Sequence, residues 1–565
     1  MRFVLSARGS RALSRTLLAS AAICCASAAQ ASVSISDKPT SNMSCAGGVC
    51  SPTAAKANLN VTDLANSLAA GDIKIVSDSA AKDIEFKAPL SWTSTSRLTL
   101  DSYRSIIFQQ PITVTGTGAA TVDSRQGDLD GTITYVKKGR ITFWDLSSKL
   151  MIDGLNYKLV NSVSMLARAI AKKSSGNYAL ANNYDAAADG KYRKSPIAEF
   201  HGFAEGLGNA ISHLTIDDRT PGNNVGLFAT TAQLSRVYNF RLVNAHVSAA
   251  GGGARAGALI GQTTGFLQGD SVSGSVKTGD DSYVGGLVGD QDDPGKISFC
   301  ESSATISGGN SMHAGGIAGK GYEIDNSAAS GNVTIIDGEA GGLVGDLAYL
   351  STYSRATGNV VSTGDGGGIG GLAGNAYEID YSYATGAVSG ADGSAAGGLA
   401  GSSITTRASF ATGAVNVTGS NGIVGGLLGQ DIGLTWNSYA AGTVNSGSND
   451  DEVGGLIGLY WGGAQIYASY AVGSVAGGNN VGGVAGFAEN GAEDMTAAYW
   501  DLETSGISDP HQAVGNVGDY PGATGLTSEQ FKSGLPDGLD PKVWGQSPNI
   551  NDGYPYLLAN PPPKK

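Results

Sequence analysis

Apolar and polar residues alternate along much of this chain, in short runs that are broken by glycine. Runs at residues 73–76, 97–100 and 112–114 show the period of two that is typical of half-buried strands. From about residue 251, blocks of Gly-Gly-aliphatic-x-Gly recur every 26 to 30 residues, and their first glycines are Gly285, Gly315, Gly341, Gly370, Gly397, Gly425, Gly454 and Gly482. A fixed period of this size predicts a stacked repeat architecture.

A second signature within the same repeats defines an interior face. Ala-x-Gly-x-Val occurs once per repeat, and its valines are Val333, Val360, Val388, Val415, Val444 and Val475. Residues two apart on a strand point the same way, and only small residues recur beside each valine, which indicates a narrow interior. We therefore predict an all-β, right-handed parallel β-helix with about two or three short strands per coil, in which glycine serves left-handed corners and close backbone approaches.

Changes of pattern divide the chain into segments. In residues 161–173, Val163, Leu166 and Ile170 fall at helical spacing and predict one short helix. Short gaps between the strands of the N-terminal region fit either hairpins or coil corners, and the repeats that follow favour coils. We predict a signal peptide at 1–31, a flexible lead-in at 32–58, a β-helical N-terminal region at 59–250, the repeat β-helix at 251–490, and a C-terminal cap and tail at 491–565.

The N-terminus has the features of a secretory signal peptide. Four arginines precede an apolar segment at 17–26, and Ala29-Gln30-Ala31 matches a small-x-small cleavage site. A membrane anchor is the alternative, but a span needs roughly 18 or more apolar residues. We expect cleavage after Ala31, no membrane span, and a secreted or cell-surface protein.

Charge and cysteine content narrow the partners further. The net charge is −13, and loss of the four N-terminal arginines would make it −17, which argues against nucleic acid. After that cleavage, Cys45 and Cys50 remain as a close pair. In an exported protein this spacing favours a disulfide, and a metal or redox pair is the alternative. Cys300 is expected to be a small buried residue.

One column of aromatic residues is the leading candidate for a binding site. Five positions before the aligned valine, the repeats carry Tyr383, Phe410, Tyr439 and Tyr470, with Arg355 before them. In a β-helix these rings would stack about 4.8 Å apart on the outward face. Two roles are open: a covered stack that stabilises neighbouring coils, or an exposed platform for sugar rings or a protein partner.

Three acidic turns are the remaining candidates for chemistry. Clustered carboxylates can serve a polysaccharide lyase or hydrolase, or a weak calcium site, although neighbouring turn residues favour solvated corners. None of the five histidines lies in an HExxH motif, so a zinc protease is not expected. We predict no catalytic residue, metal or cofactor, and a protein that is not an enzyme. The three turns are Asp217-Asp218-Arg219, Asp290 with Asp292-Asp293, and Asp450-Asp451-Glu452.

The GGLVG and SYATGAV pair at this period resembles the GLUG repeat of large bacterial surface proteins, over about residues 251–490. Residues 64–228 are similar, more loosely, to haemagglutination-type regions of filamentous adhesins, with Tyr178-Ala179-Leu180 and Val225-Gly226-Leu227-Phe228 as markers. The resemblance implies a secreted or surface-associated protein of a Gram-negative bacterium, often adhesive. The chain lacks the NPNG-type signature of two-partner-secreted adhesins, so the route past the inner membrane stays open, with an outer-membrane secretion partner as a candidate.

Together these features favour an adhesin-like protein that binds a glycan or a host or matrix protein by multivalent contact along a repeated face. A polysaccharide-active lyase or hydrolase on the same fold is one alternative, and it predicts several carboxylates converging on one face. A structural spacer is the other alternative, and it predicts no exposed ladder and no ligand.

Overall fold

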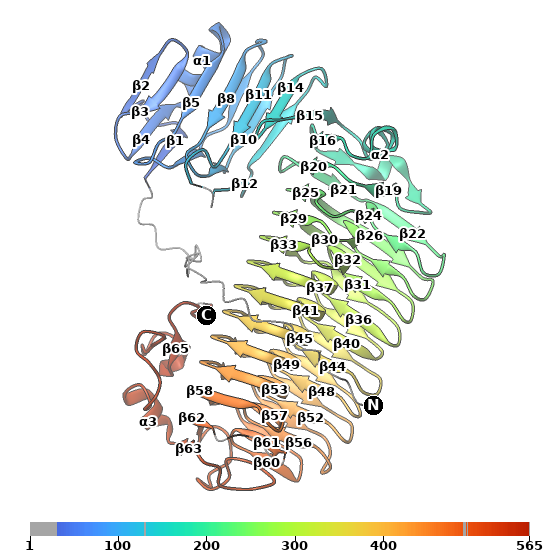
Figure 1. Ribbon diagram of the computed structural model, residues 1–565, viewed down its shortest axis with the longest axis vertical. Helices are drawn as coiled ribbons and strands as arrows, with labels where there is room; N and C mark the ends of the chain where they lie inside the picture. Colours follow the sequence, from blue (N-terminus) through green and yellow to red (C-terminus); the bar gives the residue numbers. More distant parts are fainter. Residues whose placement is uncertain (1–30, 129–130, 490–492, 494, 564–565) are drawn as a thin grey trace, which may run out of the picture.

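The computed structural model describes residues 31–128, 131–489, 493 and 495–563. Strands make up 49% of the described residues and helices 6%, and parallel coils stack into a β-solenoid of about 17 turns. Figure 1 shows two sections that meet at an angle, a shorter N-terminal one in blue and a longer one that runs from green to orange. The predicted parallel β-helix is confirmed. The predicted signal peptide, apart from Ala31, lies outside the described residues.

The N-terminal section has three sheets of stacked strands. In the first, β1 (Ser32–Ser36) lies between β4 (Ala57–Asn60) and β6 (Asp83–Phe86), and both pairs are parallel. The flexible lead-in predicted at 32–58 is therefore wrong, because Val33 and Ile35 of β1 are fully buried in the core. The other strands of the section are β9 (Ile106–Phe108) and β12 (Ile133–Tyr135) in the first sheet, β7 (Leu90–Trp92), β10 (Pro111–Val114) and β13 (Arg140–Phe143) in the second, and β5 (Ile73–Val76), β8 (Arg97–Asp101), β11 (Ala119–Asp123) and β14 (Lys149–Ile152) in the third.

A helix and a hairpin protect the N-terminal end of this section. The sequence reading missed α1 (Val61–Ala70), whose N-cap Asn60 accepts hydrogen bonds from the backbone of Thr62 and Asp63. Strands β2 (Met43–Ala46) and β3 (Val49–Pro52) form an antiparallel hairpin that extends the third sheet beside β5, and Cys45 and Cys50 form a disulfide across it. The hairpin and α1 cover sheet edges that would otherwise be open to pairing with other chains.

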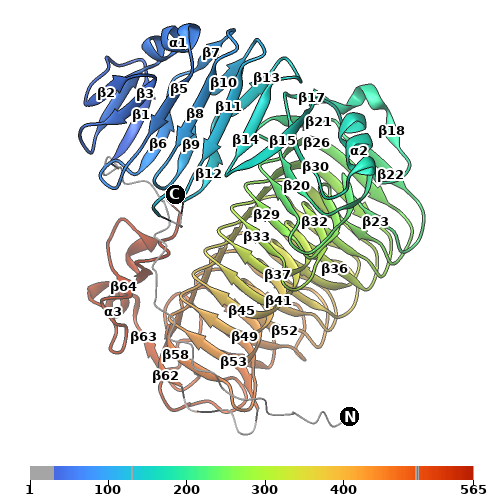
Figure 2. The same cartoon turned by 45° about the horizontal axis from the view of Figure 1, so that its top comes forward.

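The chain reverses direction between the two sections. β14 and β15 (Leu155–Val160) are antiparallel and are joined by Asp153 and Gly154, which have φ values of 46° and 78°. After α2 (Val163–Lys172), which agrees with the helix predicted at 161–173, β16 (Asn177–Leu180) pairs in parallel with β15. Strands on either side of the β14–β15 pair, which is visible in Figure 2, therefore run in opposite directions.

Each coil of the repeat holds four strands rather than the expected two or three. One coil consists of β48 (Ala395–Gly397), β49 (Ala400–Arg407), β50 (Phe410–Ala411) and β51 (Val415–Val417). Each strand pairs in parallel with its counterpart in the next coil. The long strands in the position of β49 are β37 (Ala318–Asp325), β41 (Val344–Thr352), β45 (Ala373–Asp380) and β53 (Leu428–Trp436), and β57 (Ile457–Tyr460) with β58 (Gln465–Ala471) replaces them in the next coil.

The glycine block serves close approach between backbones, and the left-handed corners lie outside this block. A Cβ built on Gly398 would lie 2.2 Å from the carbonyl oxygen of Gly426 and 2.9 Å from the Cβ of Ala411. The block and the Ala-x-Gly-x-Val motif therefore recur together because they meet across the narrow interior. The corner after each long strand has a φ of 47° at Tyr381, 46° at Ala408 and 51° at Asn437, whereas Gly366 and Gly393, with φ values of 77° and 64°, lie in left-handed turns before the next block. Glycine therefore serves only some of the corners.

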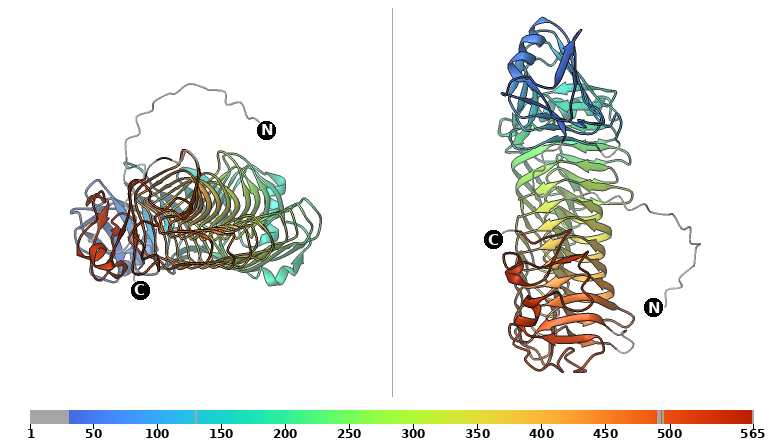
Figure 3. Two further views of the ribbon diagram at one scale, coloured as in Figure 1. Left: turned by 90° about the horizontal axis from the view of Figure 1, so that it is seen from below. Right: turned by 90° about the vertical axis from the view of Figure 1, so that its left-hand side faces the viewer.

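The C-terminal residues form two different structures. The last coil has Trp500 in the position that the alanine of the Ala-x-Gly-x-Val motif occupies in earlier coils, and the ring of Trp500 covers Gly483. Strands β62 (Thr496–Asp501) and β63 (Ala523–Leu526) close the end of the solenoid. Residues 527–560, here called the strap, then turn back along the side of the solenoid. Figure 3 (right) shows this red segment lying across the orange and yellow coils. The strap contains α3 (Ser528–Ser533), β64 (Trp544–Gly545) and β65 (Tyr556–Leu557).

Candidate binding face

The predicted aromatic column forms a regular stack, here called the ladder. Ring centroids of Tyr383 and Phe410 are 4.9 Å apart, those of Phe410 and Tyr439 are 4.8 Å apart, and those of Tyr439 and Tyr470 are 5.1 Å apart. The planes of neighbouring rings differ by 5° to 6°. Parallel pairing of β46 (Tyr383–Ala384), β50, β54 (Tyr439–Ala440) and β58 holds one ring in each coil.

The strap covers this ladder, so the structure agrees with the first of the two predicted roles, a covered stack, and Phe410, Tyr439 and Tyr470 do not form an exposed binding platform. Phe410, Tyr439 and Tyr470 are completely buried, and Tyr383 is half-buried. The ring of Trp544 lies 6.1 Å from that of Tyr439 and 5.6 Å from that of Tyr470. The strap makes this contact because its own large apolar side chains, Phe531, Trp544, Tyr554 and Leu557, form one buried cluster with the ladder.

Hydrogen bonds fix the strap at several heights along the solenoid. The hydroxyl of Tyr470 donates to the carbonyl of Pro555, and the Trp544 Nε1 donates to Asn437 Oδ1 at 3.1 Å. Near the end of the strap, Asn560 donates to the carbonyl oxygens of Ser382 and Ala408, both at 3.2 Å. Burial raises the pKa of the Tyr439 and Tyr470 hydroxyls far above their usual range, so the covered ladder is uncharged.

A different column of large apolar side chains is exposed on the neighbouring face, and we call it the exposed stripe. It follows the long strands β37 to β57, next to the point where β-bulges shift the register between coils. Tyr377, Ile404, Ile432 and Trp461 are 48%, 40%, 42% and 38% exposed in four successive coils. Tyr322 and Tyr349 continue the column, half-buried, with ring centroids 5.2 Å apart. The stripe therefore crosses six successive coils.

The borders of the stripe are polar, and most of their charges are paired. Asn375, Ser402 and Gln430 each lie two residues before a stripe residue and pair in register with one another. On the other side, Arg407 binds both Glu378 and Asp380, the latter at 3.0 Å. Lys296 likewise binds Glu323 at 2.8 Å and Asp325 at 3.3 Å. The exposed stripe therefore offers flat apolar surfaces with hydrogen-bonding groups beside them, and the nearby carboxylates give it a weakly negative electrostatic potential.

The sequence reading missed the stripe although a signal for it exists. A bulky apolar residue occurs three or four positions after the last glycine in six of the eight blocks, as in Gly374 to Tyr377 and Gly458 to Trp461. In four of these coils the bulky residue also lies 11 positions before the aligned valine, and in the last two coils it lies 12 and 14 positions before it. The column was therefore visible in the sequence, from the glycine block in all six coils and from the valine in four of them.

A ladder of buried serines was also missed. Ser382 Oγ accepts a hydrogen bond from the backbone N–H of Ser354 at 3.1 Å and donates to the carbonyl of Asp380 at 2.8 Å. Equivalent bonds link Ser409 and Ser438 to their neighbours in the same way. Serine occurs six positions before each aligned valine from Val333 to Val475, so the spacing was readable. These bonds satisfy backbone groups at the left-handed corners.

The acidic turns are mostly buried and bonded rather than solvated. Asp217 binds Lys191 and Arg193, and Asp218 accepts hydrogen bonds from Thr220 and Asn223. Asp451 is completely buried and accepts a hydrogen bond from the backbone of Gly422 at 2.6 Å. The interpretation as solvated corners is therefore wrong for these carboxylates.

The remaining acidic turn, Asp290 with Asp292-Asp293, belongs to a network of charged side chains next to the glycine blocks. Asp290 binds Arg255 at 2.8 Å, Asp292 binds Lys320 at 2.8 Å, and Glu339 binds His313. Burial raises the pKa of Asp290. Burial alone would lower the pKa of His313, but the hydrogen bond with Glu339 raises it. Each pair joins neighbouring coils. Within the described part of the chain, no group of three or more His, Cys, Asp or Glu side chains is placed to hold a metal ion.

Cys300 is fully buried, as expected, and burial raises the pKa of its thiol far above the usual range. Among the helices of the described residues, none is long and apolar enough to cross a membrane.

Comparisons with known proteins give one partial similarity. No family model matches the chain. The chain is similar to halomucin from Haloquadratum walsbyi (strain DSM 16790 / HBSQ001), with 36% identity over 221 residues. The similarity covers 36% of this chain and 2% of halomucin, so the chain corresponds to a small part of that protein.

Proposed function

We propose that this chain is an exported, surface-associated β-helical protein that acts without catalysis, by adhesin-like binding along one repeated face. The observation that carries the proposal is the exposed stripe, which presents large apolar side chains in six successive coils. Monomeric proteins rarely leave a contiguous apolar patch open unless it binds something. The similarity to a protein named halomucin and the resemblance to GLUG-repeat adhesins favour a surface protein.

Export is supported by the disulfide between Cys45 and Cys50, because disulfides persist in oxidising compartments. The expected signal peptide agrees with this location, and the resemblance to filamentous adhesins favours a Gram-negative surface with an outer-membrane secretion partner. The stacked backbone bonds make the binding face rigid, so little ordering is needed when a ligand lies on it. Many weak contacts along the face would then add up.

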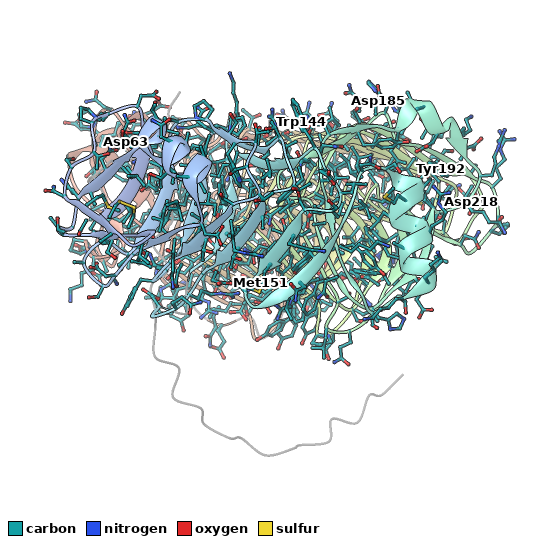
Figure 4. All side chains as sticks on the ribbon, turned by 90° about the horizontal axis from the view of Figure 1, so that it is seen from above. Asp63, Trp144, Met151, Asp185, Tyr192 and Asp218 are labelled. Atoms are coloured by element: carbon teal, nitrogen blue, oxygen red, sulfur yellow. A yellow bond between two sulfur atoms is a disulfide. The ribbon has the colours of Figure 1, made fainter. Side chains whose placement is uncertain are left out.

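Binding of the full chain to arrays of glycans and of matrix proteins tests this function. The test variant carries Tyr377→Ser, Ile404→Ser, Ile432→Ser and Trp461→Ser, and circular dichroism checks that its fold is unchanged. Trp144→Ser is the matched control, because Trp144 is 68% exposed and directly follows β13 in the N-terminal section (Figure 4). We expect binding by the wild type and the control, and loss of binding by the stripe variant. Equal binding by all three proteins would refute the proposal.

A polysaccharide-active enzyme is the second candidate function. It is favoured by the charge network around His313 and Glu339, because groups with shifted pKa values often cluster at active sites. Release of reducing ends from arrayed glycans, abolished by Glu339→Gln, would support the enzyme. A chain that binds and cleaves nothing would instead support the structural spacer.

A further inference from the structure

We propose that the exposed stripe is the binding face for a linear, neutral polysaccharide that lies along the axis of the solenoid. This inference rests on the proposed function and names the ligand class and the site for it. The stripe residues are Tyr322, Tyr349, Tyr377, Ile404, Ile432 and Trp461.

The geometry of the stripe suits a polymer rather than a compact ligand. One large side chain projects from each coil, and neighbouring coils lie about 4.8 Å apart, so the six positions span about 24 Å in a line. The column is one residue wide and runs over open strands. A ligand that contacts all six positions must itself be extended and repetitive, as a linear polysaccharide is.

The chemistry of the stripe suits sugar rings. Tyrosine and tryptophan present flat apolar faces with polar edges, and a pyranose ring presents a face of C–H groups with hydroxyls around its rim. Tyr377 and Trp461 can stack on such faces, and Ile404 and Ile432 extend the apolar surface between them. Asn375, Ser402 and Gln430 supply neutral hydrogen-bonding groups two residues away on the same strands. The rim hydroxyls of a sugar would lie against this polar border.

The charges beside the stripe exclude an anionic polymer. Two basic residues, Lys296 and Arg407, are shared among four carboxylates, Glu323, Asp325, Glu378 and Asp380. The border therefore keeps a negative charge, and the whole chain has a net charge of −13. A polyanionic glycan or a nucleic acid would be repelled at this face. A neutral polymer meets no such repulsion.

Affinity electrophoresis of the full chain tests the inference, with hydroxyethyl cellulose, galactomannan or a soluble starch as neutral polymers and alginate as the anionic one. The variants are the fourfold stripe variant, Trp461→Ala alone, and Trp144→Ser as the control. We expect retardation in at least one neutral gel and none in alginate. Trp461→Ala should weaken binding about tenfold, and the stripe variant should lose it. The matching hexasaccharide should bind at least about tenfold more tightly than the disaccharide.

Several results would overturn the inference. Equal retardation of the wild type and the stripe variant would place the site elsewhere, and stronger retardation by alginate would exclude a neutral ligand. If no neutral polymer binds but the stripe variant loses binding to an arrayed protein, the ligand is a protein and the proposed function survives. If the wild type binds nothing on any array or gel, both proposals fail.

Discussion

Replacing Trp544 by alanine should release the strap from the ladder while the coils stay folded. Trp544 is 1% exposed, its ring lies against Tyr439 and Tyr470, and its Nε1 bonds to Asn437. Truncation of a buried tryptophan to alanine costs about 3–5 kcal/mol. The strap lies near the C-terminal end of the described residues and packs against the side of the solenoid. The lost free energy should therefore favour opening of the strap and not unfolding of the coils.

The size of the effect follows from this free energy. Each 1.4 kcal/mol changes an equilibrium about tenfold, so the strap should open at least about 100-fold more often in the variant. The coils keep their own backbone ladders and their own core, which is separate from the cluster beneath the strap. Local opening of this kind is what hydrogen exchange measures.

Hydrogen–deuterium exchange with mass spectrometry would measure the change, by comparing peptides from residues 527–560 with peptides from residues 395–417. Trp461→Ala is the matched control, because it removes a tryptophan that is 38% exposed and lies outside the buried cluster beneath the strap, so it should leave both regions protected. Unchanged protection of the strap in Trp544→Ala would refute the idea that this cluster holds it. Equal loss of protection in strap and coils would show that the strap is part of one cooperative unit.

Three further predictions follow from the buried groups. Burial raises the pKa of Glu205 to about 8, so the free energy of unfolding should fall as pH rises from 4.5 to 8, by about 5 kcal/mol in all. Glu205→Gln should remove this fall, and an unchanged pH dependence of thermal unfolding in the variant would contradict the prediction. Gly398→Ala should destabilise the repeat by about 3 kcal/mol in urea unfolding, because a Cβ at this position has no room. Gly534→Ala is the control and should be nearly neutral, because nothing lies within 4 Å of its Cβ position. Similar urea midpoints for the two variants would refute the role of the block in close approach. Ser382→Ala leaves the buried N–H of Ser354 without its acceptor and should lower the free energy of unfolding by about 1–3 kcal/mol. No change in urea unfolding would show that the serine ladder contributes nothing to stability.

The fold was predictable because its signals are local and repeated. A constant period, the small residues beside Val333 to Val475, and the apolar spacing of Val163, Leu166 and Ile170 all act within one coil or one helix. The prediction of a flexible lead-in was wrong because residues 32–36 form one short strand, and no repeat lies beside them in the sequence. Their partners, in β4 and β6, come more than 20 residues later.

The binding face was only partly predictable. The stacking of Tyr383, Phe410, Tyr439 and Tyr470 follows directly from their spacing. Their burial depends on contacts between segments far apart, such as Asn560 and Ser382, which are 178 residues apart, and no periodic pattern carries that information. Four of the six stripe residues lie 11 positions before an aligned valine, so their column was predictable from the spacing, but spacing alone does not show that the column is exposed.

The most direct test of the account compares the fourfold stripe variant with Trp544→Ala for binding to the same glycan and matrix-protein arrays. The account predicts that the stripe variant loses binding, and that Trp544→Ala binds as the wild type does, because recognition lies on the exposed stripe and not on the ladder. Binding that survives in the stripe variant and increases when Trp544 is removed would contradict it, and would place recognition on the ladder beneath the strap.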